Sequence, residues 1–506
     1  MRRSVLDLGS NSFHVLVADV SVEGYIDPVM RERQMLHLGR VVAELGRIPD
    51  DLADVAVESV ADLSELARRT GATEHHAVAT SALRDARNGP ELIDRMSEAA
   101  GTHIEVIPGH EEARLSYLGV RAALGVAPAG LAVLDLGGGS LELAIGTQRT
   151  PDLVTTTKLG VSRLSTLVRN DPMQKMDRRR LSEAITSELE LSGGAFETQL
   201  PGRVVAVGGT VRALARVIAA EDHDWVPMTL NRLPVKTDRL LALRRELQQL
   251  DRGGRAAVPG MKTRRADHAH VAATILGEVL KQLGVERFEV CDWGLREGVL
   301  LDRAGTDLAP APSALRAREV LRLHDAFRTD MHCRHTADLA VQLWDVTAQL
   351  HGLEPHDREL LHHAAVVHGV GSALALRKHQ MHAAYIVAHA ELRGFSPTMC
   401  AQLVTLARFQ SSGGIDRTFP AAASLDDTSY DRTVKLLALL QAAKGLNRTE
   451  DNAVTSLTLG SVDDDSITIV LHGDGLDIAH RDLARRTRLF QRTFGRELKI
   501  CRKGAS

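Results

Sequence analysis

A short sequence pattern that occurs twice places the strongest constraint on what this chain can fold into. It reads VLDLGSNSFHVLVA at residues 5–18 and VLDLGGGSLELAIG at residues 133–146. Six positions are identical in the two copies, and three of them carry chemistry: Asp7 and Asp135, Gly9 and Gly137, and Ser12 and Ser140. Each copy predicts two apolar strands joined by a Gly/Ser turn, which is a β-hairpin with a phosphate-binding tip. Unless the two hairpins are alike by chance, the chain holds two similar halves whose turns face one cleft.

Helix-like and strand-like segments alternate after each hairpin. Apolar residues recur at helical spacing over 51–69, and 112–124 is a second predicted helix. Strand-like runs follow at 76–80, 104–107 and 203–207, and the last leads through the Gly-rich turn at 208–210 into another predicted helix. This alternation predicts α/β domains.

The chain of 506 residues is too long for one core, so we expect several domains. A Pro-containing linker at 304–314 precedes a region of long, His-rich helices, one of them at 334–350. Further along, we expect a loop at 411–432, two strands joined by an acidic turn at 454–472, and a charged helix at 479–496. The predicted domains are two α/β domains at 1–127 and 128–306, a helical domain at 313–445, and a small α/β unit at 446–506.

Composition excludes several classes of protein. A net charge of −3 shows no basic excess, and only 3% of the residues are aromatic, so we expect no nucleic-acid partner. Asp7 interrupts the first apolar stretch, and no run of about 18 apolar residues occurs, so we expect no signal peptide, no membrane span and a cytoplasmic location. The four cysteines are too far apart for a zinc knuckle and are expected to be reduced thiols.

Three Gly-rich turns follow predicted strands, and each is suited to an anion. They are GSNS at 9–12, GGGS at 137–140 and GGT at 208–210. Glycines let backbone N–H groups converge on a phosphate, and the third turn also precedes a helix N-terminus. One such turn alone would be an ordinary tight turn, but three after three strands favour phosphate binding.

Carboxylates adjoin these turns. Asp7 and Asp135 end their strands, and Glu142 follows the second turn, so hard oxygen ligands for Mg²⁺ would lie beside bound phosphate. The alternative is that the aspartates cap turns. Glu111 and Glu112 begin a predicted helix. Carboxylates interact favourably with the dipole at this end of a helix, which explains both residues more simply than a catalytic role does.

Taken together, six motifs resemble the exopolyphosphatase/guanosine pentaphosphate phosphohydrolase (Ppx/GppA) family. They are DLGSNSFH (7–14), ATSALRDARN (79–88), PGHEEAR (108–114), DLGGGSLE (135–142), VGGTVRALA (207–215) and GLREG (294–298). The resemblance implies two duplicated actin-like (ribonuclease H-like) domains around a cleft.

The resemblance also implies roles for individual residues. Glu112 matches the family's catalytic base, and Asp135 and Glu142 match carboxylates associated with a divalent metal, Mg²⁺ or another such cation. The positions that match phosphate contacts are Ser10, Asn11, Arg84, Gly138, Gly139, Ser140, Gly208, Gly209 and Thr210. Leu141 departs from the pattern, because the family commonly has Ser or Thr there.

The implied function is hydrolysis of the terminal phosphate of inorganic polyphosphate, by metal-assisted in-line attack of water. Alternatives are hydrolysis of guanosine pentaphosphate, a nucleotide or polyphosphate sensor without turnover, and a sugar-kinase-like transferase. The low aromatic content favours polyphosphate over a guanosine nucleotide.

The helical half resembles the HD-type domain of longer members of the same family, in HCRHTADLA (332–340), LLHHAAVVHGVG (360–371), KHQMHAAYIV (378–387) and LVTLARFQ (403–410). An HD hydrolase needs an adjacent His-Asp pair on its metals, but Gly369 follows His368. Other histidines of this region are His335, His362, His363, His379 and His382. Because Gly369 stands where the pair needs an aspartate, we expect that this domain is not a second hydrolase. We expect it to extend the cleft for a polyanion, or to form contacts in a homodimer. Candidate cations for the polyanion are Arg328, Arg334, Arg377 and Lys378.

Overall fold

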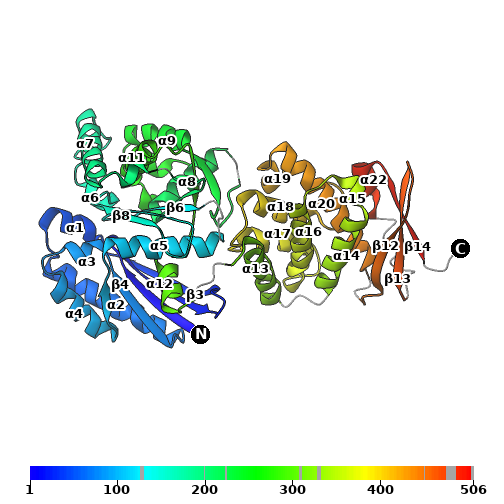
Figure 1. The fold of residues 1–506 in the computed structure, drawn as a ribbon, viewed down its shortest axis with the longest axis horizontal. Helices are drawn as coiled ribbons and strands as arrows, with labels where there is room; N and C mark the ends of the chain where they lie inside the picture. Colours follow the sequence, from blue (N-terminus) through cyan, green and yellow to red (C-terminus); the bar gives the residue numbers. More distant parts are fainter. Residues whose placement is uncertain are drawn as a thin grey trace. The chain divides into compact units, whose positions relative to one another are not determined.

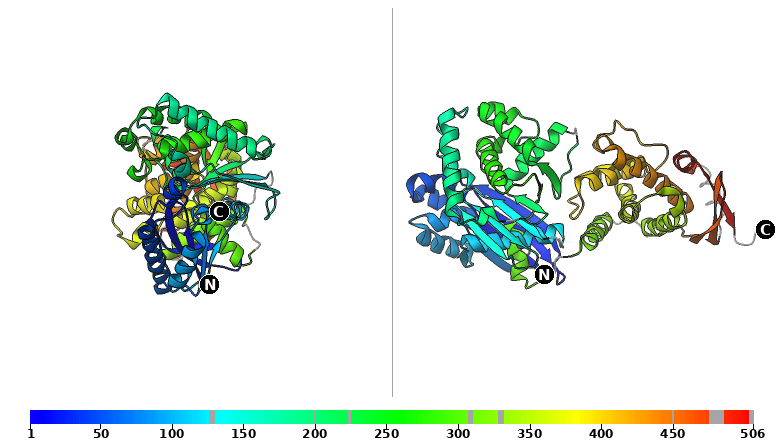
Figure 2. Two further views of the ribbon diagram at one scale, coloured as in Figure 1. Left: turned by 90° about the vertical axis from the view of Figure 1, so that its left-hand side faces the viewer. Right: turned by 45° about the horizontal axis from the view of Figure 1, so that its top comes forward.

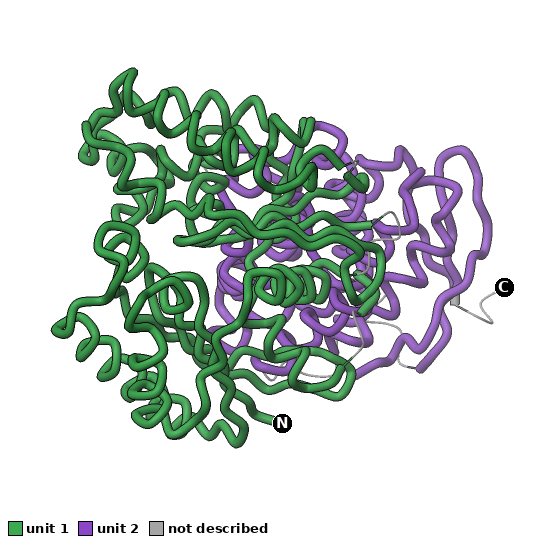
Figure 3. Tube along the Cα trace, turned by 60° about the vertical axis from the view of Figure 1, so that its left-hand side comes forward, with its two compact units in different colours: residues 1–222, 230–312 green, residues 223–229, 313–506 purple. Residues whose placement is uncertain are grey.

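The computed structural model (Figures 1 and 2) describes residues 1–125, 130–198, 200–222, 225–306, 310–327, 332–448, 451–474 and 486–502. It divides into two compact units, which have separate colours in Figure 3. The first unit comprises residues 1–222 and 230–312, and the second comprises 223–229 and 313–506. The two α/β segments at 1–127 and 128–306 thus lie mainly in the first unit.

The first sheet of the first unit contains the first hairpin. Its strands are β1 (Arg2–Leu8), β2 (Ser12–Val20), β3 (Ile26–Met35), β4 (Glu74–Ala79) and β5 (Ile104–Val106). Their order is β3-β2-β1-β4-β5, with β1 antiparallel to β2 and parallel to β4. The hairpin predicted from residues 5–18 is therefore present, with Asp7 opposite His14.

The second sheet repeats this order around the second hairpin. Its strands are β6 (Leu131–Leu136), β7 (Leu141–Gly146), β8 (Leu153–Thr157), β9 (Val204–Val207), β10 (Leu233–Lys236) and β11 (Arg287–Val290). The order β8-β7-β6-β9-β11 matches that of the first sheet, and β10 is added at the edge. Asp135 lies opposite Glu142, the register that Asp7 and His14 have in the first copy. The duplication inferred from the sequence is confirmed.

Alternation of apolar residues along β1 buries both faces of the first sheet. Val5 belongs to one core cluster, and Leu6 and Leu8 belong to another. The cluster of Leu6 and Leu8 includes α2 (Asp50–Arg69) and α4 (Gly89–Ala100), which lie together on one side of the strands in Figures 1 and 2.

Two helices, α5 (Gly109–Leu124) and α12 (Leu295–Arg303), share the other cluster with residues of both sheets. Their backbones approach closely, because a Cβ at Gly298 would lie 1.8 Å from the Leu115 carbonyl oxygen. The glycine at the end of the GLREG motif is therefore required by helix packing. The last helix of the segment 128–306 thus packs on α5 of the first segment, and Figure 1 shows α5 passing between the two lobes.

The remaining helices of the first unit cover its edges and its second sheet. They are α1 (Leu38–Leu45), α3 (Ser81–Asp85), α6 (Val161–Ser165), α7 (Lys175–Leu191), α8 (Gly209–Asp222), α9 (Thr237–Gln249), α10 (Arg252–Ala257) and α11 (Ala269–Gln282), with 3-10 turns η1 (Ala195–Glu197) and η2 (Thr263–Arg265). Helix α11 packs against both α8 and α9, which fixes the loop that precedes it beside the N-terminus of α8.

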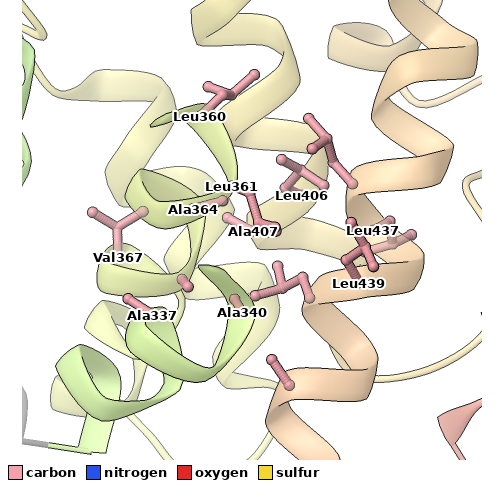
Figure 4. Close-up of a cluster of buried hydrophobic side chains, with 14 of the residues drawn as sticks. Ala337, Ala340, Leu360, Leu361, Ala364, Val367, Leu406, Ala407, Leu437 and Leu439 are labelled. Atoms are coloured by element: carbon pink, nitrogen blue, oxygen red, sulfur yellow. The ribbon is translucent and has the colours of Figure 1, made fainter. Parts of the chain in front are cut away.

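The second unit is helical and ends in a small sheet. Its helices are α13 (Pro312–Ala326), α14 (His332–Val346), α15 (Ala348–His351), α16 (Pro355–Val367), η3 (Val370–Ala373), α17 (His379–His389), α18 (Pro397–Phe409), α19 (Pro420–Ala423) and α20 (Asp427–Leu446). Leucines and alanines of α14, α16, α18 and α20 meet in its core (Figure 4). Two predictions need correction here: the helix expected over 334–350 ends at Val346, and the segment 411–432 is not one loop. Asp426 begins α20 by accepting a hydrogen bond from the Ser429 amide.

The C-terminal strands β12 (Val454–Val462), β13 (Ser466–Gly473) and β14 (Glu497–Arg502) form a sheet in the order β12-β13-β14. The two strands predicted within 454–472 are thereby confirmed. Of the predicted helix 479–496, residues 479–485 lie outside the described residues, and α22 (Arg488–Phe494) forms in the rest. Ile467 and Phe490 belong to the same core as the helices, so the sheet is not a separate unit. Within the described ranges, every helix is too short or too polar to cross a membrane.

Candidate active site

The turns of both hairpins and the third Gly-rich turn line one cleft of about 200 Å³ in the first unit. Ten of the residues predicted to form the site line it: Ser10, Asn11, Glu112, Asp135, Gly138, Gly139, Ser140, Gly208, Gly209 and Thr210. The two hairpin turns have the same internal hydrogen bond, from the Gly9 amide to the Ser12 carbonyl (3.2 Å) and from Gly137 to Ser140 (3.0 Å). The sequence repeat thus becomes a structural repeat on opposite sides of the cleft.

Glycine is needed where the two lobes meet. A Cβ at Gly139 would lie 1.7 Å from Ser81 Oγ and 2.7 Å from Ser10 Oγ. The two hydroxyls are themselves 3.0 Å apart, and Ser162 Oγ donates a 2.6 Å hydrogen bond across the lobes to Asn11 Oδ1. Backbone amides and hydroxyls from both lobes therefore converge in a space that admits no further side chain, which is the requirement for binding an oxyanion.

The third turn adds the N-terminus of α8. Gly208 has φ +118°, and a Cβ there would lie 2.4 Å from the Leu136 carbonyl oxygen, so only glycine fits. A Cβ at Gly209 would lie 2.2 Å from Arg265 Nη2, and Arg265 Nη1 donates to Thr210 Oγ1 at 3.3 Å. A helix N-terminus with an arginine beside it is a favourable environment for phosphate.

Four carboxylates, Asp7, Glu112, Asp135 and Glu142, lie close enough to perturb one another. Burial, followed by repulsion from Glu142 and Asp135, raises the pKa of Glu112 well above its usual value. Burial and then Asp135 raise the pKa of Glu142 from 4.5 to about 8. Burial is also the largest cause that raises the pKa of Asp135, and that of Asp7 to about 6. Burial, with a smaller contribution from neighbouring carboxylates, therefore disfavours ionisation of all four groups.

The structure distinguishes the two adjacent glutamates at the start of α5. Both oxygens of Glu111 accept hydrogen bonds from Arg114, at 2.8 and 2.7 Å. Glu112 is 8% exposed, and its Oε2 has no hydrogen-bond partner. Glu111 is thus occupied in an ion pair, whereas Glu112 presents an unpartnered oxygen within the cleft lining.

Two of the predicted site residues lie beside the cleft and not in its lining. Arg84 donates a 2.7 Å hydrogen bond to the Ile107 carbonyl, and its Nη1 lies 3.8 Å from Glu112 Oε2. Glu142 is 1% exposed and accepts a 3.1 Å hydrogen bond from Thr156 Oγ1, while its Oε2 is unpartnered. Leu141, where the family pattern has a hydroxyl, is fully buried in the core.

Sequence reasoning missed four arginines that line the cleft: Arg33, Arg212, Arg265 and Arg296. Arg212 lies in the motif VGGTVRALA and Arg296 in GLREG, so both could have been predicted from the family motifs. Arg33 and Arg265 lie in segments without a recognisable pattern. Burial and then the neighbouring Arg212, Arg264 and Arg33 lower the pKa of Arg265 to about 10. Such mutual repulsion among cations is relieved by a multiply charged anion.

His14, at the position equivalent to Glu142, also lines the cleft and is neutral. Burial and then Arg296 lower its pKa to about 3. Arg296 can only donate to His14 Nδ1, at 3.4 Å, so the ring proton resides on Nε2 and is donated to Ser12 Oγ at 2.8 Å. The two lobes therefore differ in chemistry at this position, with a neutral imidazole in the first and a carboxylate in the second.

The donor set fits a magnesium ion that shares its coordination with substrate. The described residues contain no group of three or more His, Cys, Asp or Glu side chains arranged around one metal. Mg²⁺, however, usually takes one or two carboxylates, several waters and phosphate oxygens. The unpartnered, buried oxygens of Glu112 and Glu142 and the raised carboxylate pKa values are what a dication would compensate.

The duplicated sheets, with their hairpin turns facing one cleft, place the first unit in the class of two-lobed, actin-like α/β proteins. Comparison with known proteins identifies the family. The chain belongs to the Ppx/GppA phosphatase family, whose sequence model matches residues 16–307, and the model of Ppx/GppA phosphatase domain III matches residues 315–485.

Individual relatives match about three fifths of the chain. Exopolyphosphatase 1 of Mycobacterium leprae is 31% identical over 310 residues, which is 61% of this chain and 91% of the relative. The crystal structure of an exopolyphosphatase from Cytophaga hutchinsonii aligns with a TM-score of 0.56 at 27% identity, covering 60% of this chain and 99% of its own. The Ppx/GppA family member from Aquifex aeolicus aligns with a TM-score of 0.51 at 25% identity, covering 60% and 97%.

Proposed function

We propose that this protein is an exopolyphosphatase, which releases terminal orthophosphate from inorganic polyphosphate. One observation carries the proposal: the buried Glu112 carboxylate, with one oxygen unpartnered, lies in the same cleft as three oxyanion-binding turns. Hydrolysis of a phosphoanhydride by water requires this combination of a general base and hydrogen-bond donors to the phosphate.

The Gly-rich turns would bind the terminal phosphate. The amides and hydroxyls at Gly138–Ser140 and at Gly208–Thr210 would hold its oxygens from two sides. Asp135 and Glu142 would hold a divalent cation, which when bound supplies positive charge to the phosphate oxygens. The buried position of these groups strengthens each electrostatic contact relative to water.

Glu112 would then orient a water and accept its proton. A carboxylate with an ordinary pKa is a weak base, and the raised pKa of Glu112 makes it a stronger one. Arg84, 3.8 Å from Glu112 Oε2, limits this rise and helps to keep the carboxylate ionised when the cleft is occupied. The leaving group is itself a phosphate, so no strong general acid is needed.

The lining of the cleft favours a chain of phosphates over a guanosine nucleotide. Four arginines line it, and the only Phe, Tyr or Trp side chain among its described lining residues is Trp293, which is 4% exposed. Cations can follow successive phosphates, whereas a guanine would need an accessible ring or a set of base-edge contacts.

The decisive variant is Glu112→Gln, which keeps size and hydrogen bonding but removes basicity. We expect kcat for phosphate release to fall by about 10²–10⁴-fold with little change in substrate binding. Glu111→Gln is the matched control, since it breaks only the ion pair with Arg114. If Glu111→Gln were the crippling change and Glu112→Gln were active, Glu112 would not be the base.

The substrate is tested by comparing kcat/KM for long polyphosphate and for guanosine pentaphosphate with Mg²⁺ present. We expect the higher value for polyphosphate. A tenfold preference for guanosine pentaphosphate would reverse the assignment while leaving the proposed chemistry intact.

A further inference from the structure

A second pocket, of about 540 Å³, lies within the second unit among its helices. His332 and His379 are the first residues of α14 and α17, and both line it. His368, at the end of α16, and Lys444, in the last turn of α20, also line it. The pocket is thus built from four helix ends inside one unit and is independent of the cleft described above.

The chemistry of this pocket is basic. Three cations line it, Lys444, Arg448 and Arg486, together with the imidazoles of His332, His368 and His379. Its described lining residues include no aspartate or glutamate. A concave site lined by one sign of charge concentrates counter-ions, and here the counter-ion is an anion. The dipoles of the helices that begin and end there oppose one another, so the side chains decide the sign.

The ammonium of Lys444 is held in place by a buried amide. Lys444 Nζ donates to Gln410 Oε1 at 2.5 Å, and Gln410 is fully buried. Gln410 Nε2 in turn donates to the His368 carbonyl at 2.6 Å and to the Ala407 carbonyl at 3.0 Å. The position of this cation is therefore fixed by three further groups, unlike that of a surface lysine.

The histidines do not make the pocket a metal site. His368 Nδ1 donates to the Ala365 carbonyl at 2.6 Å, and burial, followed by Lys444, lowers its pKa to about 3, so the ring is neutral. Gly369 offers no carboxylate, and the described residues contain no cluster of three potential ligands. A dication would lie beside an ammonium without an anionic ligand, which is electrostatically unfavourable.

One buried acceptor in the lining completes the site. Asn447 is 5% exposed, and its Nδ2 donates to the His332 carbonyl and to Thr336 Oγ1, both at 3.1 Å. Its Oδ1 has no hydrogen-bond partner. An anion that keeps an acidic hydroxyl can donate to this oxygen while its other oxygens face the cations, and hydrogen phosphate has this combination.

We propose that the pocket among α14, α16, α17 and α20 binds a phosphate oxyanion, with the Lys444 ammonium as its central contact and Asn447 Oδ1 accepting from a phosphate hydroxyl. The oxyanion has two sources, free orthophosphate or the terminal group of a phosphate chain. The proposal does not depend on the function assigned to the cleft.

The test is calorimetric titration of the full-length protein with orthophosphate in chelator, comparing wild type with Lys444→Gln. Glutamine removes the charge but can still donate to Gln410. We expect the Kd of one phosphate site to rise at least about tenfold, which corresponds to loss of a charge-assisted contact. Lys435→Gln is the control, because Lys435 is on the same helix, donates a hydrogen bond to the His351 carbonyl and does not line the pocket.

Two further arms separate the alternatives. Repeating the titration in an Arg265→Gln background perturbs the cleft, so a site that survives there and is lost with Lys444→Gln is the one proposed. Titration of long-chain polyphosphate in a Glu112→Gln background tests the second source, the terminal group of a phosphate chain. If Lys444→Gln weakens the binding of polyphosphate but not of orthophosphate, the pocket binds a chain terminus. If Lys444→Gln alters neither affinity, or if the wild type binds a transition metal here in a Lys444-independent way, the proposal is wrong.

Discussion

Glu142 provides the sharpest test of the electrostatics of the cleft. Its carboxylate is 1% exposed, faces Asp135 across the β6–β7 hairpin and accepts a hydrogen bond from Thr156 Oγ1. Burial and the Asp135 charge raise its pKa from 4.5 to about 8. Between these values the folded protein retains a proton that the unfolded chain releases, so the free energy of unfolding falls as pH rises.

Glu142→Gln removes this penalty, because the amide cannot ionise and still offers an oxygen to Thr156. At about 1.36 kcal/mol per pKa unit, a rise from 4.5 to about 8 costs about 4 kcal/mol at pH 8 and under about 0.5 kcal/mol near pH 4.5. The metal-free variant should therefore be more stable than wild type at pH 8 by up to about 4 kcal/mol, and nearly equal to it near pH 4.5.

The assay is urea denaturation in chelator at both pH values, followed by circular dichroism. Glu183→Gln is the control, since Glu183 is an exposed partner of Arg179 on α7 and should change stability by less than about 0.5 kcal/mol at either pH. Saturating Mg²⁺ should narrow the difference between Glu142→Gln and wild type. If Glu142→Gln changed the free energy of unfolding equally at both pH values, the pKa of Glu142 would be the same in the folded and unfolded states, and the reasoning from burial would fail.

Three further predictions concern activity. Asp135→Asn should raise the Mg²⁺ concentration needed for half-maximal phosphate release by about 10–100-fold, and full activity of this variant in chelator would remove the metal from the mechanism. Arg265→Gln should raise KM for polyphosphate by about tenfold or more with a smaller effect on kcat, and an unchanged KM would show that Arg265 does not contact the chain. Gly139→Ala should reduce kcat/KM by about 10²-fold, because its methyl group would collide with Ser81 Oγ and Ser10 Oγ; wild-type kinetics would mean that the lobes can separate there without cost.

The second unit shows where local sequence patterns mislead. The segment 411–432, rich in Gly, Ser and Asp, predicts a loop, yet α19 and the start of α20 lie within it. The same residues that favour turns also cap helices, and Asp426 does so at α20. Arg334, Arg377 and Lys378 remain candidate polyanion contacts, whereas Arg328 lies outside the described residues. The cations that line the pocket of the unit are instead Lys444, Arg448 and Arg486, which lie outside the His-rich motifs.

The sequence by itself determined the duplicated hairpins, their Gly/Ser turns and the family, because strand alternation and turn chemistry are local and recur in both copies. It also pointed to Glu112 and Asp135, which the structure brings to the cleft lining. Only the tertiary structure decided that Arg33 and Arg265 join that lining and that α12 returns to pack on α5. These features depend on distances between residues far apart in the chain and on how deeply each charge is removed from water, and neither quantity is encoded in a local pattern.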